Sequence, residues 1–356
     1  MNFYKTVRSI QIEHSSMCNA RCPQCMREWY GGDHSFFKQT YIPTSFYKTR
    51  IPDNIYQNLE TINFCGTVGD PCTAPNFIEA VKVVKSKNPN IRLSISTNGG
   101  MRGPIWWAKL ASALSKNDVV TFGIDGLEDT NHIYRVGVKW NKLMANVSAF
   151  IEAGGTADWQ MIMFKHNEHQ YDQAKELSEK MKFRSFFKAY NHRFMLESAT
   201  GRLAIGGNGL PLQPPSSEQH QSIIIKRKSD IIKEKDEWHA VAENNCISCQ
   251  AQKNDDAYID VETHLFPCCF LAGAKHTLSP TENPKDGYYD LWKKFGSDKI
   301  KLSLNGWDDI ITSDFFDEIQ DRWNKKFLKG RLFVCSIVCI PKPEVAMTVY
   351  NIKNNI

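Results

Sequence analysis

The 356-residue chain lacks a long hydrophobic run, a strong excess of one charge and an internal repeat. No stretch approaches the ~18 consecutive apolar residues that a membrane-spanning helix needs, so we expect no membrane partner. The net charge of +5 permits an anionic partner but does not require one, and nucleic acid is therefore not expected. Hydrophobic residues make up 42% of the chain and charged ones 23%, a balance that excludes a long disordered polar protein.

The amino terminus also lacks the features of an export signal. Residues 1–16 contain neither an apolar core nor a small-residue cleavage site, so we expect no secretory signal and a cytoplasmic location. Cysteine, in contrast, is abundant, with eleven residues. In a reducing compartment, clustered thiols bind metal or carry out redox chemistry more often than they form disulfides.

Short β-branched runs alternate with helical patterns through the first half of the chain. This order predicts an α/β fold, a partial (β/α)6 barrel of parallel strands, with active residues beyond the carboxyl ends of the strands. The predicted strands cover residues 7–13, 61–65, 91–96, 119–124, 159–164 and 184–189. The predicted helices cover residues 77–87, 104–114, 141–153 and 170–181.

A Gly- and Pro-rich stretch over residues 201–217 marks a break in composition. We predict a first domain over 1–196, a linker over 197–217 and a smaller α+β domain over 218–356, which begins with a charged helix over 218–244. The aromatic segment 26–52 predicts a packed helix and loop, with a lid beside the active site as the alternative.

The first cysteine group is Cys18, Cys22 and Cys25, which follows the first predicted strand with the spacing C-x3-C-x2-C. Three thiolates in one loop can hold three corners of a cubane iron–sulfur cluster and leave one iron open to an outside ligand. The alternative is a zinc site completed by His14 or His34, which would make the chain a zinc-dependent nucleic-acid-binding module without catalysis.

Polar motifs follow the next three predicted strands. They are Gly66-Thr-Val-Gly69-Asp70-Pro71, Ser96-Thr-Asn98-Gly99 and Gly123-Ile-Asp125-Gly126, the last followed by His132 and Arg135. Each motif alone has a structural explanation, such as a turn, a helix cap or a surface cation. Their order along the chain and their common position at strand ends point to one site.

The cysteine loop and these motifs together resemble the radical S-adenosylmethionine (radical SAM) superfamily. The resemblance implies that Cys18, Cys22 and Cys25 are catalytic and hold a [4Fe–4S] cluster. S-adenosylmethionine would bind its open iron and be cleaved reductively to a 5′-deoxyadenosyl radical, which abstracts a hydrogen atom from a substrate. A flavodoxin- or ferredoxin-type electron donor is also implied.

The resemblance further implies a set of cofactor-binding residues. Asp70 stands where the family has Glu, and Gly123 stands where it has Ser. The first change shortens a carboxylate arm, and the second removes an expected hydroxyl contact. The implied cofactor-binding residues are Gly69, Asp70, Ser96, Asn98, Asp125 and Arg135.

A second cysteine group lies in the C-terminal region, where an alternating pattern over residues 257–267 predicts a β-hairpin that leads into a cysteine pair. This region resembles the SPASM/twitch extension of radical SAM enzymes, although Thr263 stands where the family has Gly. The resemblance implies one auxiliary [4Fe–4S] cluster, and a zinc site with four thiolates is the alternative. The candidate metal ligands are Cys246, Cys249, Cys268, Cys335 and Cys339; we prefer Cys249, Cys268, Cys335 and one of Cys246 or Cys339.

The expected function is therefore that of a radical SAM oxidoreductase or maturase. Family members with this extension act on peptides, protein side chains or small polar molecules. A peptide or protein side chain is the first substrate that we predict, and a small polar metabolite is the second.

Overall fold

The computed structural model describes residues 6–29, 37–191, 193–194, 203–221, 246–275, 287–326 and 329–339. Most of the charged helix expected over 218–244 lies outside these residues, and within them Glu218–His220 forms a short 3-10 helix, η3. None of the helices in the described ranges has both the length and the apolar content required to cross a lipid bilayer.

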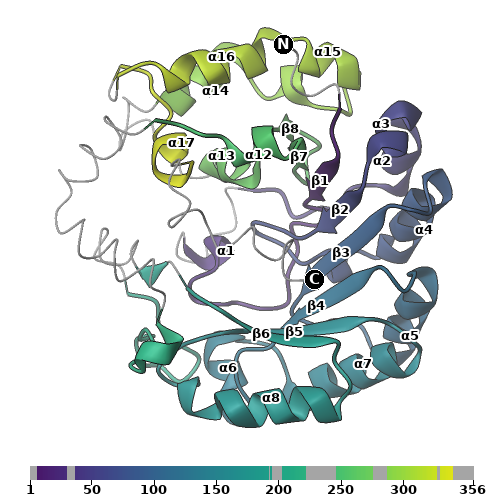
Figure 1. The fold of residues 1–356 in the computed structure, drawn as a ribbon, viewed down its shortest axis with the longest axis vertical. Coiled ribbons are helices and arrows are strands. Elements are labelled where there is room, and N and C mark those ends of the chain that lie inside the picture. Colours follow the sequence, from purple (N-terminus) through teal and green to yellow (C-terminus); the bar gives the residue numbers. More distant parts are fainter. Residues whose placement is uncertain are drawn as a thin grey trace.

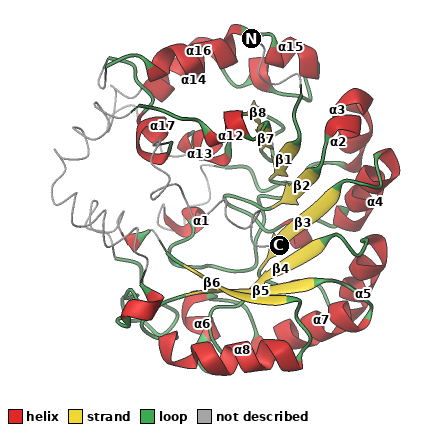
Figure 2. Cartoon of the chain, in the orientation of Figure 1, coloured by secondary structure: helices red, strands yellow, loops and turns green. Residues whose placement is uncertain are grey.

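One eight-stranded sheet organises the chain, in the order β6-β5-β4-β3-β2-β1-β7-β8. Every neighbouring pair is parallel except β7 and β8, which form an antiparallel hairpin. The strands are β1 (Ser9–Ile12), β2 (Thr61–Phe64), β3 (Arg92–Thr97), β4 (Val119–Gly123), β5 (Ala157–Ile162), β6 (Ser185–Ala189), β7 (Asp256–Ile259) and β8 (Leu265–Phe266). The predicted α/β class and all six predicted strands are confirmed, and the sheet does not close into a full barrel (Figure 2).

Helices cover the outer side of the curved sheet, and shorter segments lie on its inner side (Figure 1). The outer helices are α2 (Thr44–Thr49), α3 (Asp53–Asn58), α4 (Phe77–Lys87), α5 (Pro104–Ala113), α7 (Trp140–Glu152) and α8 (Tyr171–Lys180). Phe46 and Tyr47 of α2 are buried in the core, as the packed-helix interpretation of segment 26–52 predicts. Residues 30–36, which belong to the segment of the alternative lid, lie outside the described residues.

The two faces of the sheet differ in polarity. On β1, β2 and β3, fully buried apolar residues alternate with half-buried or exposed polar ones. Gln11, Asn63 and Ser94 are direct register partners, so their side chains share one face, and Ser96 follows on the same face. Because the apolar face packs under the outer helices, this polar row lines the concave side.

The C-terminal region continues the same sheet, since β7 pairs in parallel with β1. The hairpin predicted over 257–267 is present as β7 and β8. The helices of the C-terminal region are α12 (Gln250–Lys253), α13 (Cys269–Ala274), α14 (Gly287–Phe295), α15 (Trp307–Ile311), α16 (Asp314–Trp323) and α17 (Phe333–Val338). A shared sheet fixes the position of this region against β1, the strand that leads into the first cysteine group.

Thr263 in the hairpin turn has a positive φ of 71°, the left-handed conformation that glycine adopts most easily. Its backbone N–H donates to the carbonyl oxygen of Asp260 at 2.9 Å, and its hydroxyl donates to Ser303 Oγ at 3.0 Å. The turn therefore keeps a glycine-like backbone without glycine, because local hydrogen bonds offset the strain.

Candidate active site

The first cysteine group lies in the loop that connects β1 to the short helix α1 (Met26–Trp29). Cys22 is buried, and Cys18 and Cys25 are half-buried. The backbone N–H of Cys25 donates to the carbonyl oxygen of Cys22 at 2.8 Å, which turns the chain tightly between these two thiols. The loop begins at the carboxyl end of a parallel strand, where ligand sites of α/β proteins form.

The loop after β2 holds the start of the cysteine loop in place. The backbone N–H of Asp70 donates to the carbonyl oxygen of Met17 at 2.8 Å, and Thr73 Oγ1 donates to the same oxygen at 2.9 Å. From the other side, Arg27 Nη1 donates to the carbonyl oxygen of Ser16 at 2.6 Å. Contacts with segments that are distant in the sequence therefore hold the start of the cysteine loop in place.

The buried carboxylate of Asp70 accepts several hydrogen bonds from residues in the loops after β2 and β3 and at the end of β3. It accepts hydrogen bonds from Cys72 N at 3.0 Å, from Thr97 Oγ1 at 2.9 Å, and from both the backbone N–H and Nδ2 of Asn98 at 2.8 Å. Burial raises the pKa of Asp70, and these donors oppose the rise. Asp70 therefore ties the loops after β2 and β3 together.

Asn98 reaches from this anchor to the first cysteine. Its Nδ2 lies 3.6 Å from Cys18 Sγ and 3.1 Å from Asn19 Oδ1. The backbone N–H of Ala20 also points at Cys18 Sγ, at 3.4 Å. Two N–H groups thus face one sulfur, as expected for a thiolate ligand whose charge is stabilised by its surroundings.

Asp125 and Arg135 form a second anchored pair beside Cys22. Arg135 Nε donates to Asp125 Oδ2 at 2.5 Å, and Asp125 Oδ1 accepts from the backbone N–H of Ile162 at 2.6 Å. Arg135 Nη1 lies 3.8 Å from Cys22 Sγ. The motif after β4 therefore reaches the same cysteine loop as the motifs after β2 and β3.

Of the six predicted cofactor-binding residues, Ser96 is placed differently from the others. Gly69, Asp70, Asn98, Asp125 and Arg135 surround the cysteine loop. Ser96 is exposed on the concave face of β3, beside Thr121 of β4 in the strand register. The structure thus brings five of the six together around the thiols and leaves Ser96 on the polar inner face.

Neither cysteine group brings three sulfurs within 4.8 Å of one another in the part of the chain that the structure describes. Among the described residues, the one group of three ligand atoms within 4.8 Å of one another is Asp260, Glu262 and His264. A zinc ion with Zn–S bonds of about 2.3 Å holds its thiolates about 4 Å apart, whereas a cubane spreads them over separate irons. Neither cysteine group is thus preformed for a single zinc ion.

Burial changes the protonation of two of the three thiols in the first group, Cys18 and Cys22. Burial raises the pKa of the Cys22 thiol to about 11, although the Arg135 guanidinium opposes this rise. Burial also raises the pKa of Cys18, and the nearby Asp70 carboxylate adds to the effect. Both thiols would be protonated near neutral pH without metal, and metal binding would release those protons.

The acidic group in the hairpin turn already has a cation of its own. Lys275 Nζ donates to Asp260 Oδ2 at 2.5 Å and to Glu262 Oε2 at 3.2 Å. His264 Nδ1 lies 2.8 Å from the same Asp260 oxygen. We therefore assign this group to stabilising the turn before Cys268.

The second cysteine group forms at the ends of three short helices. Cys249 precedes α12, Cys268 precedes α13, Cys335 lies in α17 and Cys339 ends it. The thiols of Cys249 and Cys339 are hydrogen-bonded to each other. This bond raises the pKa of Cys339, with burial and the nearby Cys335 and Cys268 thiols adding to it.

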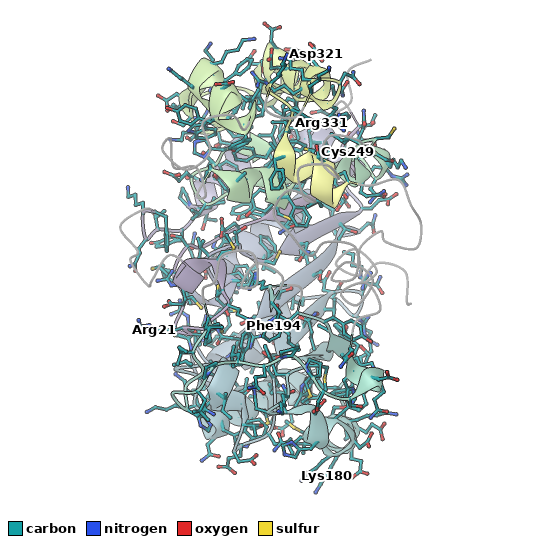
Figure 3. The ribbon with its side chains drawn as sticks, turned by 90° about the vertical axis from the view of Figure 1, so that its left-hand side faces the viewer. Arg21, Lys180, Phe194, Cys249, Asp321 and Arg331 are labelled. Carbon is teal, nitrogen blue, oxygen red and sulfur yellow. The ribbon has the colours of Figure 1, made fainter. Side chains whose placement is uncertain are left out.

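Cys246 and Cys339, the two alternatives for the fourth ligand, are in different surroundings. Cys246 is exposed, whereas Cys339 joins the other three thiols. Ser248 N donates to the carbonyl oxygen of Cys339 at 2.7 Å and fixes the end of α17 beside Cys249. Figure 3 shows Cys249 well apart from Arg21 of the first loop, so the two cysteine groups occupy separate places.

Glu13 is a residue of the site region that the motifs did not identify. It follows β1 directly and is buried, with Oε1 accepting from Val68 N at 2.8 Å and Oε2 accepting from Tyr258 Oη at 3.3 Å. Burial raises the pKa of Glu13 to about 7. A carboxylate directly after a strand is the signal available in the sequence, but its partner Tyr258 lies 245 residues away.

Comparison with known families gives a match over the first part of the chain. Residues 12–178 match the Radical SAM superfamily. The chain is also 23% identical, over 287 residues, to the tungsten-containing aldehyde ferredoxin oxidoreductase cofactor-modifying protein of Pyrococcus furiosus. That alignment covers 74% of this chain and 71% of the relative.

Solved structures share the fold. The structure of anSMEcpe with bound AdoMet (S-adenosylmethionine) gives a TM-score of 0.52 at 14% identity and covers 92% of this chain and 86% of that one. Streptococcus suis SuiB bound to the precursor peptide SuiA gives a TM-score of 0.51 at 14% identity and covers 76% of this chain. This chain spans 62% of the length of SuiB. At such identities the likeness establishes the fold alone.

Proposed function

We propose that the chain, whose residues 12–178 match the Radical SAM superfamily, is an enzyme that cleaves S-adenosylmethionine reductively. Cys18, Cys22 and Cys25 would hold the [4Fe–4S] cluster. When bound, this cluster supplies the electron that cleaves the carbon–sulfur bond of S-adenosylmethionine and yields a 5′-deoxyadenosyl radical. The observation that carries the proposal is the three-thiol loop at the end of β1, which N–H donors face from the loops after β3 and β4.

The chain's own residues would orient the site. Asp70 and Asp125 hold Asn98 and Arg135 against the cysteine loop through buried hydrogen bonds. We keep all six residues, including Ser96, as proposed cofactor contacts. Electrons would come from a flavodoxin or ferredoxin. The cytoplasm is the compartment that we propose, because thiols that serve as cluster ligands require a reducing environment.

The concave face of the sheet would receive the substrate. Its row of amide and hydroxyl side chains, Gln11, Asn63, Ser94 and Ser96, offers hydrogen bonds in a place where parallel sheets usually present apolar residues. This favours a polar substrate. A peptide or protein side chain is the first candidate, supported by the peptide bound to SuiB, and a small polar metabolite is the second, supported by the cofactor-modifying Pyrococcus relative.

An auxiliary cluster is the further part of this proposal. Cys249, Cys268, Cys335 and Cys339 would supply four thiolates and leave no open iron. Such a closed cluster favours electron transfer from the substrate over direct substrate binding. The enzyme would then be of the oxidoreductase or maturase type with a SPASM/twitch-like extension.

The test is anaerobic reconstitution with iron and sulfide, followed by incubation with dithionite and S-adenosylmethionine. We expect a brown protein that forms 5′-deoxyadenosine, measured by liquid chromatography and mass spectrometry. The Cys18→Ala, Cys22→Ala and Cys25→Ala variants should form none. Cys65→Ala is the matched control, because it removes a thiol just past β2 and should retain cleavage.

Two outcomes would contradict the proposal. A folded, iron-loaded protein that forms no 5′-deoxyadenosine would rule out reductive cleavage. A colourless protein that binds zinc and no sulfide would support the zinc-dependent module instead.

A further inference from the structure

Arg135 lies against a sulfur of the proposed cluster. Its Nη1 is 3.8 Å from Cys22 Sγ, within the range of an N–H···S hydrogen bond. The guanidinium is mostly enclosed, with 16% of the side chain exposed, so solvent screens its charge only in part. A permanent positive charge thus faces one of the three thiols.

This position is built by two further residues. Asp125, whose side chain is fully buried, accepts from Arg135 Nε at 2.5 Å and is itself held by the backbone N–H of Ile162. Gly123 leaves room on the strand: a Cβ at that position would lie 2.3 Å from Arg135 Nη2. The Gly that replaces the family's Ser therefore makes space for the guanidinium beside Cys22.

The contact between the Arg135 guanidinium and the Cys22 sulfur does not require S-adenosylmethionine. Nε is used by Asp125, Nη2 packs over Gly123, and Nη1 faces Cys22. The same guanidinium could still contact a carboxylate of S-adenosylmethionine, as the family resemblance implies. A hydrogen bond from Arg135 to the Cys22 sulfur is different from that contact, because its effect on the cluster can be measured without S-adenosylmethionine.

We propose that Arg135 donates a hydrogen bond to the Cys22 thiolate and thereby raises the reduction potential of the cluster. Reduction adds one negative charge to the cluster, and a nearby cation with an N–H···S bond stabilises that reduced form. Asp125 and Gly123 act as positioning residues for the guanidinium. This inference rests on the proposed function, since it needs a cluster on Cys18, Cys22 and Cys25.

The experiment is a redox titration of reconstituted protein without S-adenosylmethionine, followed by electron paramagnetic resonance of the reduced cluster. To isolate that signal, all variants are made in a background that carries Cys268→Ala and Cys339→Ala. Arg135→Gln should shift the midpoint potential downward. Arg21→Gln is the matched control, because it removes one positive charge from the cysteine loop itself, where the Arg21 side chain is 68% exposed at the edge of the molecule (Figure 3).

Two further variants test the geometry. Arg135→Lys keeps the charge but loses the planar fork, so its potential should fall between those of the parent and Arg135→Gln. Gly123→Ala keeps the arginine but displaces its guanidinium, and its potential should also shift downward. Thermal unfolding and the iron content of each variant show whether it is folded and loaded.

The outcomes separate the inference from the proposed function. If the loaded Arg135→Gln variant has the same potential as Arg21→Gln, the inference is wrong even though the enzyme proposal stands. If the potential is unchanged but S-adenosylmethionine binds more weakly, Arg135 is a cofactor contact alone, and the inference is again wrong. If the parent protein yields no reducible cluster, the proposed function itself fails.

Discussion

Gly69 packs directly against the backbone of Ser15. A Cβ on Gly69 would lie 1.7 Å from the carbonyl oxygen of Ser15, so no larger residue fits there. Ser15 leads into the cysteine loop, and Gly69 belongs to the loop after β2. This contact sets the distance between the two loops that bring Cys18 and Asp70 together.

We predict that Gly69→Ala separates these loops. The added methyl group would meet main-chain atoms that cannot move alone, and overpacking of this kind costs about 1–3 kcal/mol or more. The free energy of unfolding, measured by denaturant titration of the metal-free protein, should fall, and iron loading should fall with it. Gly103→Ala is the control, because a Cβ there meets no atom within 4 Å and its stability should be unchanged. Equal stability of the two variants would contradict this account of Gly69.

Glu13 and its neighbour His14 should give opposite dependences of stability on pH. Burial raises the pKa of Glu13 from 4.5 to about 7, so the native state keeps a proton that the unfolded state loses, and stability falls as pH rises through this window. Burial lowers the pKa of His14 from 6.5 to about 4, so the native state lacks a proton that the unfolded state binds, and stability rises with pH from about 4 to 6.5.

The two contributions should largely cancel in the parent protein, and single variants should expose them. Relative to the parent, Glu13→Gln should become more stable by up to about 3 kcal/mol as pH rises from 4.5 to 7. His14→Gln should show the opposite trend between 4 and 6.5. The measurement is denaturant unfolding of the metal-free protein at several pH values. A pH-independent difference between parent and Glu13→Gln would show that Glu13 does not titrate there.

The proposed auxiliary cluster predicts unequal effects of two cysteines. Cys339→Ala should hold less iron and sulfide than the parent and show an altered auxiliary cluster, because Cys339 joins the thiols of Cys249, Cys268 and Cys335. Cys246→Ala should retain the iron of the parent protein, because Cys246 is exposed. Iron and sulfide per chain are measured after anaerobic reconstitution. If Cys339→Ala matches the parent both in iron content and in the electron paramagnetic resonance signal of the reduced cluster, Cys339 is not a ligand.

Much of the first half of the fold could be predicted from local patterns. The six predicted strands end within two residues of the observed ones, because apolar β-branched runs bounded by polar turns are strong signals. Helix α4 covers the predicted residues 77–87. The extension of the sheet by β7 beside β1 was not predicted, because pairing between segments so far apart leaves no periodic pattern in either one.

The sequence by itself determined the chemistry of the site: three closely spaced thiols after a strand, and polar motifs at the ends of the next three strands. Short-range spacing carries that information because each motif lies within one loop. The tertiary structure decided which atoms those motifs face. Asp70 anchors Asn98, Asp125 anchors Arg135, and Cys339 rather than Cys246 joins the second thiol group, since each of these choices depends on how distant segments pack.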